Sequence, residues 1–150
     1  MSDPAQWKLP RLTVNREGEW FHEGEEVTHS GILADLWGNL RRDAAGYFLE
    51  VGPVRIPVEV ADTPFLVIRM ETDGPLFRLT VNDGTQEPLD PATLRLTAGD
   101  VPYCRVKGGQ FEARFSRAAA YQLGQLVEYD EKTGRVSLRV GGTAYDLDRE

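Results

Sequence analysis

The sequence predicts an α+β protein built from two small duplicated units, each an antiparallel sheet packed with one helix. Short runs in which apolar and polar residues alternate between Gly-rich turns predict β-hairpins along most of the chain. Two stretches, residues 28–42 and 116–127, instead place their apolar residues on one face of an amphipathic helix. The same order of hairpin, helix and hairpin occurs in each half, and this order predicts the duplication.

The N-terminal unit is expected at residues 11–64, after a mobile lead-in over residues 1–10. "RLTVNREGEWF" predicts its first hairpin, because apolar and polar residues alternate up to a Gly turn. In the helix at 28–42, Thr28 or Ser30 can cap the first turn. The run "GYFLEVGPVRIPV" then alternates on both sides of a Gly-Pro turn, which predicts a second hairpin.

The C-terminal unit is expected at residues 65–150. "FLVIRMET" is apolar enough for a buried strand, and "LFRLTV" returns from it after a "DGP" turn. The helix at 116–127 precedes another hairpin, "GRVSLRVGGTAYDL". A shift of 89 residues superposes this hairpin on "GYFLEVGPVRIPV", with Leu49 on Leu138 and Gly52 on Gly141. We therefore expect these two hairpins to be equivalent elements of the two units.

The formal charge of −7 on 150 residues argues against nucleic-acid partners, because polyanions attract cationic surfaces. The chain has no run of about eighteen apolar residues, so we expect no membrane insertion. Cys104 is the one cysteine, which excludes an internal disulfide and suits a reducing compartment. These features together predict a cytoplasmic protein.

Residues suited to catalytic or metal chemistry are few. "HEGEEVTH" gathers His22, His29 and three Glu, but a Gly turn divides them, and such clusters on exposed turns are usually solvated. Cys104 falls on the apolar face of its predicted strand, where a thiol is inert. The sequence has no nucleophile elbow, P-loop or dinucleotide-binding glycine motif. We therefore expect neither a metal nor a cofactor, and we favour a non-enzymatic function.

The stretch "PYCRVKGGQFEARFSRAA" holds four cations in an otherwise acidic chain. Its Gly-Gly pair predicts a hairpin turn that sets Arg105 opposite Glu112 and Tyr103 opposite Arg114. An ion pair and a cation–π contact across the hairpin then account for these two arginines without a ligand.

The other two cations, Lys107 and Arg117, define a candidate anion site. Lys107 lies beside the turn with a neutral neighbour, and Arg117 follows Ser116 in the first turn of the second helix. A cation is mildly unfavourable at a helix start, but it complements the exposed N–H groups once an anion binds. A phosphate or carboxylate held by Lys107, Arg117 and the amides after Ser116 is one interpretation. A solvated surface arginine is the other.

Trp20, Tyr103 and Asp62 complete the candidate ligand-binding residues. Trp20 or Tyr103 can supply an apolar wall, although large aromatic side chains more often belong to the core, and Tyr121 is expected there too. Asp62 can accept a hydrogen bond from a ligand, or it can shape the turn that leads into the next strand.

Four stretches, in order, resemble the bacterial proteins grouped as domain-of-unknown-function family 1285 (DUF1285). They are "REGEWFHEGEEV", "LRRDAAGYFL", "VADTPF" and "PYCRVKGGQFEARFSRAAAY", of which the last is the most specific. The likeness extends from about Leu12 to Leu147. The chain departs from the family at Ala61, where a Glu is typical, and at Cys104, where an apolar residue is frequent.

The resemblance implies an internally duplicated fold whose C-terminal unit is superficially like a pleckstrin-homology domain. It also implies a site between the halves for a small ligand, anionic or nucleotide-like, in signal transduction. We therefore expect a ligand-binding signalling or regulatory protein with no established activity. The alternative is an adaptor that binds a peptide of a partner protein through its pleckstrin-like half.

Overall fold

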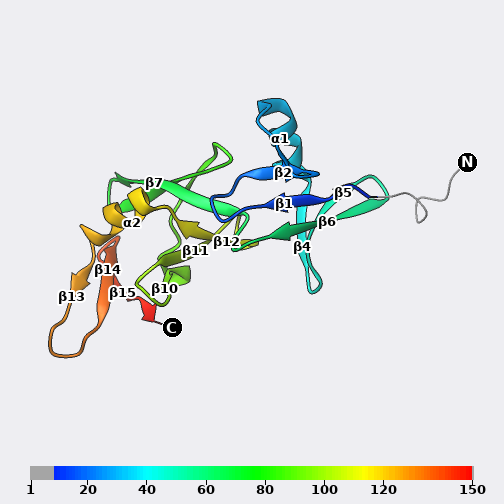
Figure 1. Cartoon of the computed structure of the whole chain (residues 1–150). Helices are drawn as coiled ribbons and strands as arrows, with labels where there is room; N and C mark the ends of the chain where they lie inside the picture. The colour runs from blue at the N-terminus through cyan, green and yellow to red at the C-terminus, as the bar shows by residue number, and fades with distance from the viewer. Residues whose placement is uncertain (1–8, 150) are drawn as a thin grey trace, which may run out of the picture. The chain divides into compact units, whose positions relative to one another are not determined.

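The chain divides into two compact units, Met1–Pro64 and Phe65–Glu150. They are coloured from blue to green and from green to red in Figure 1. The computed structural model describes residues 9–149, so most of the lead-in expected over residues 1–10 lies outside the described residues. No helix among the described residues is both long and apolar enough to cross a bilayer.

The N-terminal unit is a six-stranded sheet with one helix. Its strands follow the order β3-β2-β1-β6-β5-β4, and β1 runs parallel to β6 while the other neighbours are antiparallel. The elements are β1 (Leu12–Val14), β2 (Trp20–His22), β3 (Glu25–Glu26), α1 (Ser30–Asn39), β4 (Leu40–Asp43), β5 (Gly46–Val51) and β6 (Val54–Val60).

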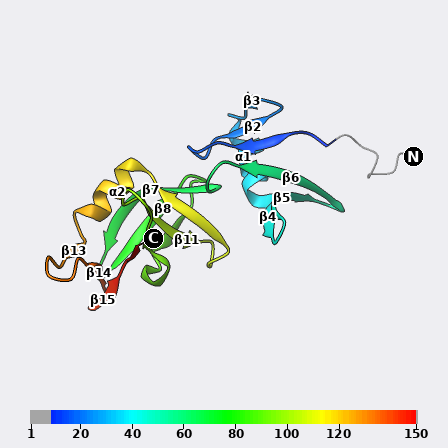
Figure 2. The ribbon, with the colours of Figure 1, turned by 60° about the horizontal axis from the view of Figure 1, so that its bottom comes forward.

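The C-terminal unit has a seven-stranded sheet, in the order β16-β10-β11-β12-β7-β8-β9, and a separate sheet of β13, β14 and β15. Helix α2 lies along β7 (Figures 1 and 2). The elements are β7 (Phe65–Asp73), β8 (Leu76–Val81), β9 (Gln86–Pro88), the 3-10 turn η2 (Pro91–Thr93), β10 (Arg95–Leu96), β11 (Pro102–Val106), β12 (Phe111–Phe115), α2 (Arg117–Gly124), β13 (Glu128–Tyr129), β14 (Val136–Val140), β15 (Thr143–Asp146) and β16 (Asp148–Arg149).

The predicted α+β class and the duplication are confirmed. Six consecutive strands in each unit follow one topology, because β9-β8-β7-β12-β11-β10 repeats the order β3-β2-β1-β6-β5-β4. In both units the first strand lies parallel to the sixth, as β1 does to β6 and β7 to β12. The sheets are therefore mixed, where the sequence predicted antiparallel ones.

The predicted register of the repeat is wrong. The hairpin β5–β6 corresponds in topology to β11–β12, whereas the 89-residue shift matched it to β14–β15, which belongs to the separate sheet. The two helices are not equivalent either, since α1 stands between β3 and β4, where the C-terminal unit has only η2. Period-2 alternation marks a hairpin without indicating which sheet it joins, so unrelated hairpins resemble each other in sequence.

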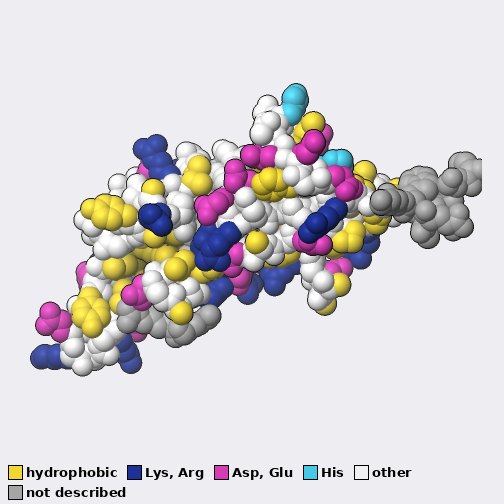
Figure 3. Space-filling view, in the orientation of Figure 1, with side chains coloured by type: hydrophobic (Ala, Val, Ile, Leu, Met, Phe, Trp, Pro, Cys, Tyr) yellow, Lys and Arg dark blue, Asp and Glu magenta, His cyan; other side chains and the backbone are white. Residues whose placement is uncertain are grey.

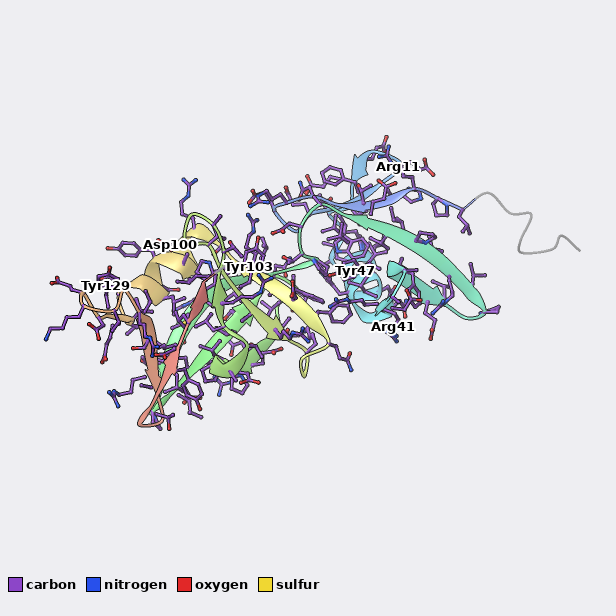
Figure 4. All side chains as sticks on the ribbon, turned by 90° about the horizontal axis from the view of Figure 1, so that it is seen from below. Arg11, Arg41, Tyr47, Asp100, Tyr103 and Tyr129 are labelled. Carbon is purple, nitrogen blue, oxygen red and sulfur yellow. The ribbon has the colours of Figure 1, made fainter. Side chains whose placement is uncertain are left out.

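Helix α1 is shorter than predicted at both ends. Its N-cap is His29, not Thr28 or Ser30, and the His29 Nδ1 accepts hydrogen bonds from the N–H groups of Gly31 (3.1 Å) and Ile32 (3.3 Å). The helix stops at Asn39 because the next residues pair with β5, where the side chain of Leu40 is buried opposite Leu49. Arg41 on β4 and Tyr47 on β5, labelled in Figure 4, therefore lie in the sheet.

The buried apolar side chains come from alternate positions of the central strands and from one face of α2. A Val, Leu, Ile or Phe side chain among them contributes about 1.5–3 kcal/mol when fully removed from water. In the N-terminal unit they include Leu12, Val14, Trp20, Leu40, Phe48, Leu49 and Val58. In the C-terminal unit they include Phe65, Val67, Leu79, Val81, Val106, Ala113, Phe115, Ala119 and Leu123.

Candidate functional site

The hairpin β11–β12 has the register that the sequence predicted. Tyr103 faces Arg114, and Arg105 faces Glu112. The side-chain contacts differ, however, because β10 lies beside β11 and brings Arg95 next to Tyr103. The Arg95 Nη2 is 3.1 Å from the Glu112 carboxylate, and its guanidinium lies 4.7 Å from the centroid of the Tyr103 ring. Arg95 thus contacts both Glu112 and Tyr103, which the sequence assigned to Arg105 and Arg114.

Lys107 has charged partners beyond the neutral neighbour that the sequence indicated. Its Nζ lies 2.6 Å from Asp83 Oδ2 and 2.6 Å from Thr85 Oγ1, both in the turn between β8 and β9. Burial tends to raise the pKa of Asp83, but the hydrogen bonds with Lys107 and Thr85 outweigh it and lower this pKa. The Lys107 N–H also donates to the Glu87 carboxylate at 3.0 Å. Lys107 therefore joins two hairpins of one sheet.

Ser116 and Arg117 begin α2 as predicted. The Ser116 Oγ accepts a hydrogen bond from the Ala119 N–H at 3.2 Å, so Ser116 is the N-cap. Lys107 lies at the opposite end of β12, and the five residues of this strand span roughly 17 Å. Lys107 and Arg117 consequently cannot hold one small anion between them.

The two aromatic candidates lie in the core. Trp20 is only 1% exposed, and its ring meets that of Trp37 edge-on, with centroids 5.3 Å apart. Tyr103 is also buried. The Asp62 carboxylate is partly exposed, and its Oδ2 is 4.0 Å from the Arg16 guanidinium. Trp20 and Asp62 belong to the N-terminal unit and the other candidates to the C-terminal unit, so a shared site at the junction stays a prediction.

A groove of about 760 Å³ runs between α2 and β7. We call it the α2–β7 groove. Two of its side chains are large, apolar and exposed: Ile68 on the strand is 43% exposed and Tyr121 on the helix is 70% exposed. The residues that line it are Ile68, Arg69, Arg117, Ala118, Tyr121 and Gln122.

A β-bulge explains why Ile68 faces solvent. The register between β7 and β8 shifts between Val67 and Arg69, which leaves Ile68 as the extra residue in the strand. Hydrogen bonds hold helix α2 against β7 on both sides of Ile68. The Gln122 Oε1 accepts a hydrogen bond from the Met70 N–H at 2.9 Å, and the Ser116 N–H donates to the Val67 carbonyl at 2.8 Å.

Sequence reasoning did not identify this groove. Tyr121 was expected in the core but is 70% exposed on α2, while Ile68 looked like part of a continuously buried strand. The unbroken apolar run "FLVI" could have indicated an exposed apolar side chain. Successive side chains of a strand alternate between its two faces, so four in a row cannot all be buried on one face.

Comparison with solved structures identifies the fold. A DUF1285 family protein from Silicibacter pomeroyi DSS-3 matches with a TM-score of 0.77 and 22% identity, over 98% of this chain and 87% of its own. A DUF1285 family protein from Shewanella baltica OS155 matches with a TM-score of 0.67 and 23% identity, over 77% of this chain and 91% of its own. The chain has the fold of the DUF1285 family proteins. No protein-family model and no curated protein matches it.

Within this DUF1285 fold, the predicted burial of Cys104 is confirmed. The side chain is buried on β11, and burial raises the pKa of its thiol to about 12. Among residues 9–149, no group of His, Cys, Asp or Glu side chains is arranged to hold a metal ion. The α2–β7 groove offers apolar surface and two guanidinium groups, those of Arg69 and Arg117.

Proposed function

We propose that the protein is an adaptor that holds a segment of a partner protein in the α2–β7 groove of its C-terminal unit. The observation that carries this proposal is the pair of exposed apolar side chains, Ile68 and Tyr121, on opposite walls of one groove. Exposed apolar side chains that gather at a concave surface, with charged groups beside them, are typical of protein-binding sites.

The openness of the groove favours a peptide over a small molecule. Small-molecule sites usually enclose about 70–90% of the ligand surface. Here Ile68 and Tyr121 themselves remain exposed, so the walls do not enclose a compact ligand on all sides. An extended or helical segment needs contact on one side only, which this groove provides.

The charge of the groove favours an acidic group on the bound segment. Arg69 is paired with Glu71, whose carboxylate lies 2.7 Å from the Arg69 Nε. Arg117 has no carboxylate partner among the described residues, and the amides of the first turn of α2 add partial positive charge beside it. A carboxylate near Arg117, next to a large apolar side chain near Tyr121, is therefore the expected recognition pattern.

A small anionic ligand is the second candidate, and the position of Arg117 beside the exposed Tyr121 ring favours it. A nucleotide-like molecule could stack its base on Tyr121 and direct its phosphate to Arg117 and the start of α2. This candidate retains Ser116 and Arg117 as site residues and does not need Lys107.

Selection from a random twelve-residue peptide library against the full chain tests the first candidate. Resynthesised peptides should contain Asp or Glu near a large apolar residue, and calorimetry should show about tenfold or greater loss of affinity for Tyr121→Ser. Tyr129→Ser is the matched control, because Tyr129 on β13 is also exposed, at 61%, and does not line the groove (Figure 4).

Peptides whose affinity is the same for wild type and Tyr121→Ser would contradict the adaptor proposal. Titration of the same proteins with adenine and guanine nucleotides distinguishes the second candidate. Nucleotide binding that Arg117→Ala abolishes, together with a failed peptide selection, would favour the small ligand. If Arg117→Ala binds nucleotides as well as wild type, that candidate is wrong.

A further inference from the structure

Helix α1 has an apolar side that its own unit covers only in part. None of its ten residues is buried, and Ile32 is 51% exposed, although Leu33, Leu36 and Trp37 give it an apolar side. Isolated helices of this length are marginal in water and gain most of their stability from packing that face. Within its unit, α1 makes its main contact with β5. The described residues of its own unit therefore leave part of this apolar surface, at Ile32, uncovered.

A groove of about 490 Å³ lies beside this surface, between α1 and the strands β1 to β3. We call it the α1–β3 groove. Four apolar side chains and several polar ones share its lining. The residues are Leu12, His22, Glu25, Glu26, Val27, Thr28, His29, Ile32 and Leu36.

One border of the groove is a sheet edge. Strand β3 is the last strand in the order β3-β2-β1-β6-β5-β4, so among residues 9–149 it pairs on one side only, with β2. It contains just Glu25 and Glu26, and both side chains are exposed. An edge strand beside an apolar helix face is an arrangement to which an extended segment can add by main-chain pairing.

Most of the charge near the groove is negative, although Arg11, which precedes the lining residue Leu12, pairs with Glu59 nearby. From Glu17 to Leu40 the chain carries six Asp or Glu residues and no Lys or Arg. Figure 3 shows acidic side chains, with the two histidines among them, gathered over β2 and α1. Glu25 and Glu26 line the groove itself. Such a surface attracts cationic segments and repels anionic ones.

We infer that the α1–β3 groove binds a segment of a partner protein in which Lys or Arg residues flank a large apolar side chain. The apolar side chain covers Ile32 and Leu36, while the cations lie near Glu25 and Glu26. This site is independent of the α2–β7 groove, which lies in the other unit and carries guanidinium groups. The protein would thus recognise segments of opposite charge at two places.

Three soluble peptides test this inference on the full chain. Each has a four-residue centre flanked by Gly-Ser repeats, and the centres are Lys-Leu-Lys-Leu, Glu-Leu-Glu-Leu and Lys-Ser-Lys-Ser. Calorimetry should detect binding of the first peptide alone. Ile32→Ser should weaken it about tenfold, and the double change Glu25→Gln with Glu26→Gln should weaken it and reduce its salt dependence.

Tyr121→Ser is the matched control, since it removes an exposed apolar side chain from the other groove and should leave this affinity unchanged. Because each variant changes one groove only, failure of the α2–β7 proposal is distinguishable from failure of the α1–β3 proposal. Circular dichroism of Ile32→Ser should match wild type, because the replaced side chain is exposed.

Four outcomes would overturn the inference. Equal binding of the Lys-Leu and Glu-Leu peptides, or binding that Ile32→Ser does not weaken, would show that neither the charge nor the helix face is recognised. Sedimentation that detects a dimer which Ile32→Ser dissociates would assign the groove to a second copy of the chain. A tenfold gain in peptide affinity on removal of residues 1–8 would assign it to the chain's own N-terminal segment.

Discussion

Lys107 and Asp83 form a salt bridge of 2.6 Å between two hairpins of the C-terminal sheet. Their side chains are 25% and 9% exposed, so both charges are largely removed from water. A pair at this depth contributes little net stability compared with two apolar residues, but loss of one partner leaves the other charge buried and unpaired. Lys107, which the sequence marked as a candidate anion receptor, is in this structure a link between β11–β12 and β8–β9.

Lys107→Met should destabilise the protein by about 2–4 kcal/mol, because it leaves the buried Asp83 carboxylate without its cationic partner. Urea unfolding at pH 7 measures the change. The double change Lys107→Met with Asp83→Leu is the control and should recover much of the loss. A Lys107→Met protein as stable as wild type would show that the salt bridge does not hold in solution.

The stability of the protein should decrease in acid, partly through Asp83. Hydrogen bonds with Lys107 and Thr85 hold the folded-state pKa of Asp83 below its ordinary value of 3.8, so the folded state binds fewer protons. The resulting stability is present above that ordinary value and is lost as the pH falls through the lower folded-state value. Asp83→Asn should be less stable at pH 7 and show a flatter stability profile below about pH 4.

His29→Ala should destabilise α1 by about 1 kcal/mol, because two N–H groups at its start lose their acceptor. His29→Asp is the control, since Asp is a favourable N-cap and should preserve stability. Gly31→Ala offers a second approach, because its added Cβ would lie 3.1 Å from the His29 Cε1 and displace the ring. Thermal unfolding temperatures of His29→Ala and Gly31→Ala equal to that of wild type would contradict the capping role of His29.

The Cys104 thiol should be unreactive in the native protein. It is buried, and its pKa is raised to about 12, so almost no thiolate forms at pH 8. Ellman's reagent should modify it only after denaturant is added. Stoichiometric modification of the folded protein would mean that β11 opens locally.

The sequence predicted local features well and long-range ones poorly. The register of β11–β12 followed from a Gly-Gly turn and strict alternation, both of which are local. The partner of Lys107 could not be predicted, because Asp83 reaches it only through the arrangement of β8, β9 and the hairpin in the folded unit. The α2–β7 groove depends on the bulge at Ile68, and no single residue type marks a bulge of this kind.

The pairing of the first strand with the sixth has a consequence for synthesis. The parallel strand pair inside each sheet joins residues far apart in the sequence, such as Leu12 with Val58 and Phe65 with Ala113. Each pair can form only after the later strand has been synthesised. While the sixth strand is still inside the ribosome, the first strand has no partner on that side. Its unpaired backbone groups can then pair with other unfolded chains and cause aggregation. Because the first and sixth strands of each motif are neighbours in the sheet, a circular permutant that begins at a hairpin turn should shorten the time during which the central strand is unpaired.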